Sequence, residues 1–363
     1  MTKRLNKFLV ILVFLLLLNL FSFLLALELD QKPDENRREV LETLKIFLAD
    51  PEGNFSKIEK VDDLNYWTMI YELIEGKNYV EELLSGQFKA SDIDENRLNI
   101  ICSLLLKYSF SPNPYDGPIA VIVDRLSDIM QSRPEWFFDN LVRQPEWKEI
   151  IRFIWAKNRD KLWENINGLK ETNRKKELLQ YLDYLKEELN EEYKWFELFL
   201  KEPGKYACEA KNIHNWGRII GYYEQNHLDE KDTLLPQDNP ILILSEWISD
   251  NTDETKIKVL LILLQHLTSG YHAEVISDLG AKVFIEHPQL FINGLKDHRH
   301  WKFLLFRISY DIYYNIYIKK KNLEDILRNI GSGRFEDEVR EELSFMVGLV
   351  SEQIRKIERK TSF

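Results

Sequence analysis

The sequence predicts an all-α protein built as an array of stacked helices that contains an internal duplication. Three observations lead to this prediction: apolar residues recur three and four positions apart along most of the chain, alternating strand patterns are absent, and one stretch is written twice. Short helices that cannot bury an apolar face alone stack on their neighbours, which is the architecture of an α-solenoid. An N-terminal export signal or anchor helix precedes this array.

Residues 1–27 are the first element in chain order. The opening MTKRLNK carries three basic residues, and the following residues 8–27 carry no charge. A basic start before an apolar run is the pattern of an export signal. The length suits both a signal peptide cut after Ala26 and an uncleaved membrane anchor, and both alternatives stay open. In either case we expect the protein to be exported: periplasmic, extracellular, or anchored in the membrane with its bulk outside.

The duplicated stretch covers residues 134–154 and 288–308. Its matched pairs, each 154 residues apart, include Phe137 with Phe291, Leu141 with Leu295, and Trp147 with Trp301. The helical segments 94–108 and 253–267 match at a spacing of 159, so the difference falls in the connection that follows them. Loops tolerate insertion and packed helices do not, which favours a duplicated structural unit over a chance match among apolar residues.

Each copy of this unit is expected to contain a helix, a loop, a second helix, a short helix and another helix. Pro134 and Pro288 suit the first turn of the short helix, where a missing N–H costs nothing. This spacing and the two copies resemble the ARM/HEAT-like family of helical repeats, over roughly a third of the chain. The unit is longer than the usual two-helix repeat of that family. The resemblance implies a binding scaffold without a shared catalytic activity.

The chain divides into three segments. Residues 1–27 are expected to form the signal peptide or membrane anchor. Residues 28–202 are expected to form the N-terminal helical-repeat half, and residues 203–363 the C-terminal helical-repeat half. The segment EPGK at 202–205, with its proline and glycine, marks the boundary between the two halves. A final amphipathic helix is expected over 333–359 as a terminal cap. Its inward residues are expected to be Val339, Leu343, Met346, Val347 and Val350.

Composition and motifs exclude several classes of function. A formal net charge of −11 repels nucleic-acid phosphates, so no nucleic-acid partner is expected. The motifs GxxxxGK, GxSxG, HExxH and CxxC are absent from the sequence, and no cofactor is expected. All seven histidines lie between residues 214 and 300, but they lack the spacing of a catalytic metal site. A metal in that region and a disulfide between Cys102 and Cys208 are left open.

Nine tryptophans and sixty acidic residues leave one enzyme alternative. Tryptophan rings and paired carboxylates are the tools of sugar hydrolases, so a helical-toroid enzyme acting on envelope glycans is the second function considered. Such a toroid would close and gather acids with aromatic rings in one pocket, whereas a solenoid would stay open. No carboxylate pair stands out in the sequence, which makes catalysis the less favoured function. The tryptophans Trp147, Trp155, Trp163 and Trp301 are expected in the core.

The helix expected over residues 300–321 has two apolar faces. One face, which includes Trp301 and Ile308, is expected in the core. The opposite face carries Tyr310, Tyr313, Tyr314 and Tyr317. Their matches in the first copy are Ala156, Arg159, Asp160 and Trp163, so the duplicated frame does not require tyrosines.

Tyrosine combines an apolar ring with a polar tip, which suits a surface that is alternately wet and bound. We therefore expect these four tyrosines to line a binding groove, the alternative being that another helix covers them. The function predicted from the sequence is an exported or membrane-anchored scaffold that binds a protein or peptide partner in the cell envelope. Contact with the membrane is expected through residues 1–27 if they are not cleaved.

Overall fold

The computed structural model describes residues 35–108, 117–214, 216–227, 238–267, 270–317 and 323–361. Every regular element in these ranges is a helix, which confirms the all-α prediction. The elements are α2 (Glu35–Ala49), α3 (Pro51–Ile58), α4 (Leu64–Glu75), α5 (Tyr79–Gln87), η1 (Ala90–Asp92), α6 (Glu95–Tyr108), α7 (Gly117–Ser132), α8 (Pro134–Leu141), α9 (Trp147–Gly168), α10 (Asn173–Lys201), α11 (Pro203–Tyr206), η2 (Ala207–Asn212), α12 (Trp216–Asn226), α13 (Pro240–Ser249), α14 (Glu254–His266), α15 (Gly270–Glu286), α16 (Pro288–Leu295), α17 (Trp301–Tyr317), α18 (Leu323–Arg328) and α19 (Arg334–Thr361).

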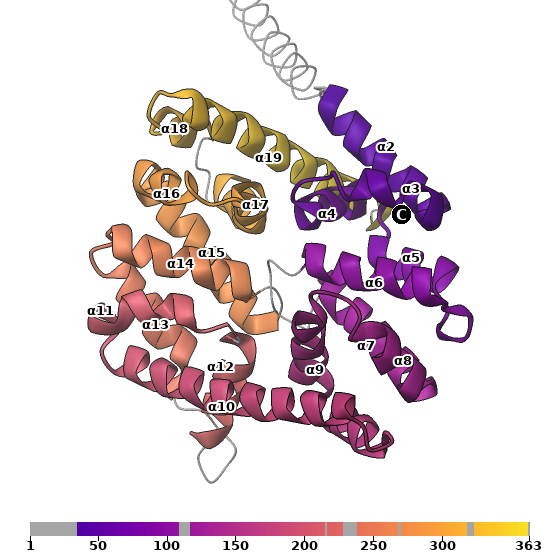
Figure 1. Cartoon of the computed structure of the whole chain (residues 1–363). Helices are drawn as coiled ribbons and strands as arrows, with labels where there is room; N and C mark the ends of the chain where they lie inside the picture. The colour runs from indigo at the N-terminus through magenta and orange to yellow at the C-terminus, as the bar shows by residue number, and fades with distance from the viewer. Residues whose placement is uncertain are drawn as a thin grey trace, which may run out of the picture.

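The helices pack in sequence around a closed course (Figure 1). Several helices lie against the next but one along the chain, as α7 does against α9 and α15 against α17. The long α10 lies on the opposite side of this course from α19, and both α17 and α19 return to contact α4. The apolar side chains of these layers form a continuous buried cluster that follows the course.

A buried carboxylate joins the two ends of the chain. Glu342 of α19 is 2% exposed and accepts hydrogen bonds from the Tyr66 hydroxyl and from Arg37 Nη2, the latter at 3.2 Å. Lys302 Nζ of α17 lies 3.2 Å from the same carboxylate. Two cations and a hydroxyl thus offset the cost of removing the glutamate from water. Burial, together with the charge of Glu342, raises the pKa of the Tyr66 hydroxyl.

The final helix therefore does more than the sequence predicts of it. The five apolar residues expected to point inward are all buried, which confirms that part of the prediction. However, α19 does not cover a free end with a charged outer face. It packs along α17 and α4 and places Glu342 between them.

Local signals in the sequence set several helix starts. Pro134 and Pro288 stand in the first turns of α8 and α16, as predicted. The Arg97 N–H donates to Asp94 Oδ1 at 2.9 Å, and the Lys256 N–H donates to Asp253 Oδ1 at 3.0 Å. These two aspartates lie 159 positions apart, and both cap the helix that follows.

The tryptophans differ in burial. Trp147 is buried and lies edge-on to Tyr181 of α10, with ring centroids 5.5 Å apart. Trp301 is half-buried and lies edge-on to Phe335 of α19 at 5.2 Å. Trp155 is buried as expected. The expectation for Trp163 is wrong, because this side chain is 45% exposed.

Two predictions about the N-terminus and the domains stay predictions. The signal or anchor at 1–27 lies outside the described residues, and within the described ranges no helix is long and apolar enough to cross a membrane. The boundary between residues 202 and 203 coincides with the end of α10. Cys102 is buried and Cys208 exposed, and both thiols are free. Burial raises the pKa of the Cys102 thiol to about 12.

Candidate functional site

The predicted tyrosines of α17 are differently exposed. Tyr310 is 57% exposed and Tyr314 is 46% exposed, while Tyr313 is half-buried and packs against the core. The side chain of Tyr317 lies outside the described part of the structure. The binding groove formed by all four therefore stays a prediction, with two of its members open to solvent.

The neighbouring helix α15 continues this surface. Tyr271, Glu274 and Asp278 are exposed and follow one another at three- and four-residue steps, so they share one face of α15. Because α15 packs against α17, this face adjoins the exposed tyrosines. We call the combined surface the tyrosine face; it consists of Tyr271, Glu274, Asp278, Tyr310, Asp311 and Tyr314.

The carboxylates of the tyrosine face repel one another. The pKa of Asp311 is raised to about 6, first by burial and then by the charges of Asp278 and Glu274, while Arg307 opposes this shift. A carboxylate responds to a like charge in this way only at short range. Arg307 is also hydrogen-bonded to neutral groups: to the Leu264 carbonyl oxygen at 3.0 Å and the Leu267 carbonyl oxygen at 2.7 Å. The face therefore combines apolar rings with concentrated negative charge.

A second candidate site lies where α9 kinks. The backbone of Asn158 has φ −127° and ψ 44°, which is not helical, so α9 consists of two helical segments. Asn158 Nδ2 donates to Ser127 Oγ of α7 at 2.8 Å, a bond that holds the kink against its neighbour.

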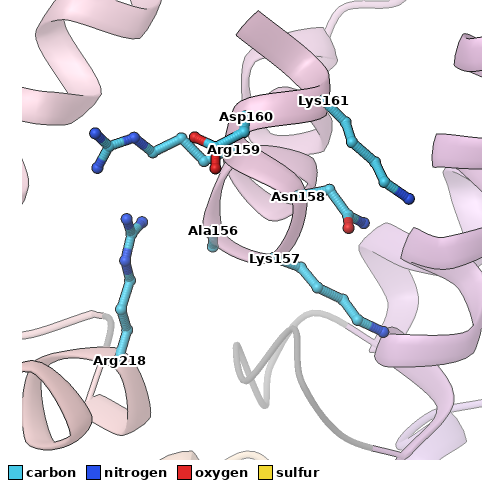
Figure 2. Close-up of a pocket in the computed structure, with 7 residues that line it drawn as sticks. All are labelled: Ala156, Lys157, Asn158, Arg159, Asp160, Lys161 and Arg218. Atoms are coloured by element: carbon cyan, nitrogen blue, oxygen red, sulfur yellow. The ribbon is translucent and has the colours of Figure 1, made fainter.

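A cleft of about 520 Å³ opens beside this kink (Figure 2). We call it the α9 cleft; it is lined by Ala156, Lys157, Asn158, Arg159, Asp160, Lys161 and Arg218. Figure 2 shows Arg159 of α9 and Arg218 of α12 projecting toward one another on one side of the helix, with Lys157 and Lys161 pointing to the other side. Four basic side chains thus line a cleft that has one carboxylate, in a protein whose net charge is negative.

The basic side chains of the α9 cleft have different partners. Lys157 Nζ lies 2.7 Å from Asp124 Oδ2 of α7 and donates to the Ala120 carbonyl oxygen at 3.0 Å. The Arg218 guanidinium lies over the Trp155 ring, 4.3 Å from its centroid. In the described part of the chain, neither Arg159 nor Lys161 forms an ion pair, and both are exposed.

A smaller pocket of about 220 Å³ adjoins the α9 cleft. The two share Arg159 and Asp160, and the smaller pocket adds Trp155 and Trp163 from α9, with Leu182, Asp183 and Lys186 from α10. A basic compartment and an aromatic compartment therefore meet at Arg159. Aromatic rings beside a polar pocket are a common surface for the ring of a small organic ligand.

An acidic pocket of about 330 Å³ lies along α10. Its lining consists of Tyr184, Glu187, Glu188, Glu191, Glu192, Trp195, Asn212 and His214. Glu188 is already engaged, because Arg152 Nη1 lies 2.5 Å from its Oε2 and the Tyr184 hydroxyl donates to its Oε1 at 3.0 Å. Exposed Trp195 and the remaining glutamates give this pocket the combination that the enzyme alternative requires.

The histidines are spread over several helices. Burial lowers the pKa of His266 to about 3, with a smaller effect from His214. Burial and the neighbouring His300 lower the pKa of His298. His272 Nε2 lies 2.9 Å from Glu224 Oε1, which links α15 to α12. Among the residues that the structure describes, no group of three or more metal-ligating side chains is arranged to hold an ion.

No family model matches this chain, and the comparisons with curated proteins and with solved structures give no match either. The resemblance to ARM/HEAT-like repeats thus has no support beyond the sequence pattern and the helical architecture. Sequence reasoning missed the α9 cleft. Its signal was the segment KNRDK at 157–161, a basic cluster with an asparagine inside a helical frame of an acidic chain.

Proposed function

We propose that this chain is an exported or membrane-anchored helical-repeat scaffold that binds a protein or peptide partner in the cell envelope through its tyrosine face. Two exposed tyrosines beside three carboxylates, one of which has a pKa raised by burial and by the charges of the other two, are the observation that carries the proposal. Negative charge next to apolar rings is matched by a partner segment rich in lysine or arginine. Such a segment would neutralise Asp278, Glu274 and Asp311 and pack its aliphatic stems on the rings.

The proposal includes an internal duplication. In this account α6 to α9 and α14 to α17 are two copies of one unit, supported by the paired aspartate caps, the proline-started short helices and the two edge-on tryptophans. The tyrosines and acids of the second copy are then additions to a shared frame. Because the shared fold of the two copies does not need these tyrosines and acids, we expect them to have a role in binding.

The test is affinity capture from an envelope extract with the full-length chain, comparing three versions. The wild type is expected to retain a partner that the double variant Tyr310→Ala/Tyr314→Ala loses. Tyr222→Ala removes an equally exposed tyrosine from outside the face, at 54% exposure, and is expected to retain the partner. A partner held equally by all three versions would remove the tyrosine face from the proposal.

Charge is tested separately with defined peptides. A fluorescent peptide that alternates lysine with leucine is expected to bind the wild type more tightly than a glutamate–leucine peptide of the same length. The preference is expected to shrink in Asp278→Asn and with added salt, because exposed charges are screened. Equal binding of the two peptides would contradict a basic partner.

A second candidate function is an enzyme acting on envelope glycans, which the acidic pocket on α10 favours. The closed course of helices and the gathering of glutamates with Trp195 and Tyr184 are the features expected of that alternative. Glu191→Gln is expected to abolish release of reducing sugar from cell-wall glycan if this pocket is catalytic. Absence of any such release by the wild type would leave the scaffold as the supported function.

A further inference from the structure

We infer that the α9 cleft binds the phosphate group of a small organic phosphate, whose ring or carbon skeleton lies on Trp163 in the adjoining pocket. This site is separate from the tyrosine face, so the inference does not depend on the proposed function. Arg159 belongs to both compartments, which makes it the residue where the charged and uncharged parts of one ligand would meet.

The charges of the cleft favour an anion. Lys157 is neutralised by Asp124, but Arg159 and Lys161 form no ion pair within the described residues. Figure 2 shows the guanidinium groups of Arg159 and Arg218 converging from two different helices. Guanidinium groups bind phosphate through paired N–H donors.

The backbone at the kink adds to this potential. Because Asn158 interrupts α9, a new helical segment starts at Arg159, and its first turn lies at the cleft. The N-terminal turn of a helix carries a partial positive charge and N–H groups without helical acceptors. Phosphate is a common ligand of such a turn when basic side chains accompany it.

The size and the lining decide the class of ligand. A volume of about 520 Å³ exceeds what inorganic phosphate fills, and the adjoining compartment of about 220 Å³ continues it toward Trp163. Trp163 is 45% exposed although its neighbours on α9 are mostly buried or charged, which leaves its ring face open. An indole ring stacks well on the C–H face of a sugar or on another flat group. A sugar phosphate and a phospholipid headgroup share this chemistry.

The experiment is calorimetric titration of the purified full-length protein at low salt with four probes. These are inorganic phosphate, glucose 1-phosphate, glucose, and the soluble lipid dihexanoylphosphatidylglycerol. Glucose 1-phosphate is expected to bind more tightly than inorganic phosphate, and glucose is expected not to bind. Saturable binding of the short-chain lipid in preference to the sugar phosphate would assign the ligand to lipid headgroups, and the reverse order to soluble phosphates.

Three variants test the residues. Arg159→Gln/Arg218→Gln is expected to weaken binding about tenfold or more, because two charge-assisted contacts are lost. Lys176→Gln removes an exposed charge from α10 outside both pockets and is expected to change nothing. Trp163→Ala is expected to weaken the organic phosphates and to leave inorganic phosphate unchanged. No saturable binding of any phosphate probe, or wild-type affinity in the double variant, would overturn the inference.

Discussion

Residues that lie 154 positions apart in the sequence carry different charges in the α7–α9 and α15–α17 helix pairs. Lys157 of α9 and Asp124 of α7 form an ion pair at 2.7 Å. The residues 154 positions later are Asp311 of α17 and Asp278 of α15, and their like charges help to raise the pKa of Asp311 to about 6. At this position the α7–α9 pair therefore holds an ion pair, whereas the α15–α17 pair holds two carboxylates that repel each other.

This difference indicates which sign of ligand charge each helix pair would attract. In the first pair the lysine is occupied, and the remaining cations, Arg159 and Lys161, face the α9 cleft. In the second pair the surplus is negative and lies beside Tyr310 and Tyr314. Retaining an unfavourable charge pair costs stability, and proteins commonly keep such a cost where binding requires it.

The helices α9 and α17 also differ in their backbone conformation. Asn158 of α9 has a non-helical conformation, and the residue 154 positions later in α17 is Ile312, which is completely buried. The Asn158 side chain donates a hydrogen bond to Ser127 of the neighbouring α7, whereas the Ile312 side chain packs in the core. The kink opens a cleft on α9, and the straight α17 presents a face instead.

The largest expected effect concerns the matched tryptophans. Trp147→Ala is expected to lower the free energy of unfolding by about 3–5 kcal/mol, because a buried aromatic side chain leaves a cavity. Trp301 is half-buried, so Trp301→Ala is expected to cost less, about 1–3 kcal/mol. Urea unfolding measures both. The control is Trp163→Ala, because Trp163 is exposed. A Trp147 variant as stable as that control would contradict the prediction that Trp147 supports the core.

The next effect is a pH dependence that only the second pair should show. Folding raises the pKa of Asp311 from an ordinary 3.8 to about 6, so between these pH values the folded chain holds a proton that the unfolded chain has released. This contribution is complete below about pH 4 and is lost as the pH rises through 6, with a size of about 1–2 kcal/mol after allowance for partial exposure.

Unfolding of the wild type and of Asp311→Asn between pH 4 and pH 7 measures this contribution. The difference between them is expected to change in that window, with the wild type losing stability as the pH rises. In Asp278→Asn the window is expected to move to lower pH, since a like charge is gone. A pH-independent difference would show that Asp311 titrates normally.

A smaller effect is expected from making the second pair imitate the first. Asp311→Lys places a lysine opposite Asp278, as Lys157 stands opposite Asp124, and is expected to stabilise the protein by about 0.5–1 kcal/mol at pH 7. The same change is expected to abolish capture of a basic partner. The reciprocal variant, Lys157→Asp, should be destabilised. Loss of stability in both variants would mean that the two helix pairs are not interchangeable at this position.

The smallest effect on stability is expected at the exposed tyrosines. Tyr310→Ala and Tyr314→Ala are each expected to change the free energy of unfolding by about 0.5 kcal/mol or less, because exposed side chains contribute little. Thermal melting of the two variants beside the wild type measures this. A large loss of stability would show that these rings support the fold, and it would contradict a binding role for the tyrosine face.

Local features of the fold could be predicted, and features that depend on distant residues could not. Pro134, Pro288 and the caps Asp94 and Asp253 act within one helical turn, so the sequence reveals them. The role of Glu342 depends on residues roughly 300 positions away and gives no local pattern among sixty acids. The expectation for Trp163 is wrong because it rests on apolar neighbours in the sequence, although about 100° per residue turns this side chain away from the buried stripe that includes Ile150 and Ile154.

The junction at Glu342 also sets the order in which the protein can mature. Arg37 and Tyr66 are made early, but their acidic partner is in the last helix, so this contact forms only after nearly the whole chain has been synthesised. Contacts between such distant residues are slow to form, because a long loop must close first. A chain that is exported before folding would therefore arrive with its ends still separate. Shortening it before residue 342 would remove both the carboxylate that pairs with Arg37 and the Phe345 ring that covers it, and would expose this part of α2 to solvent.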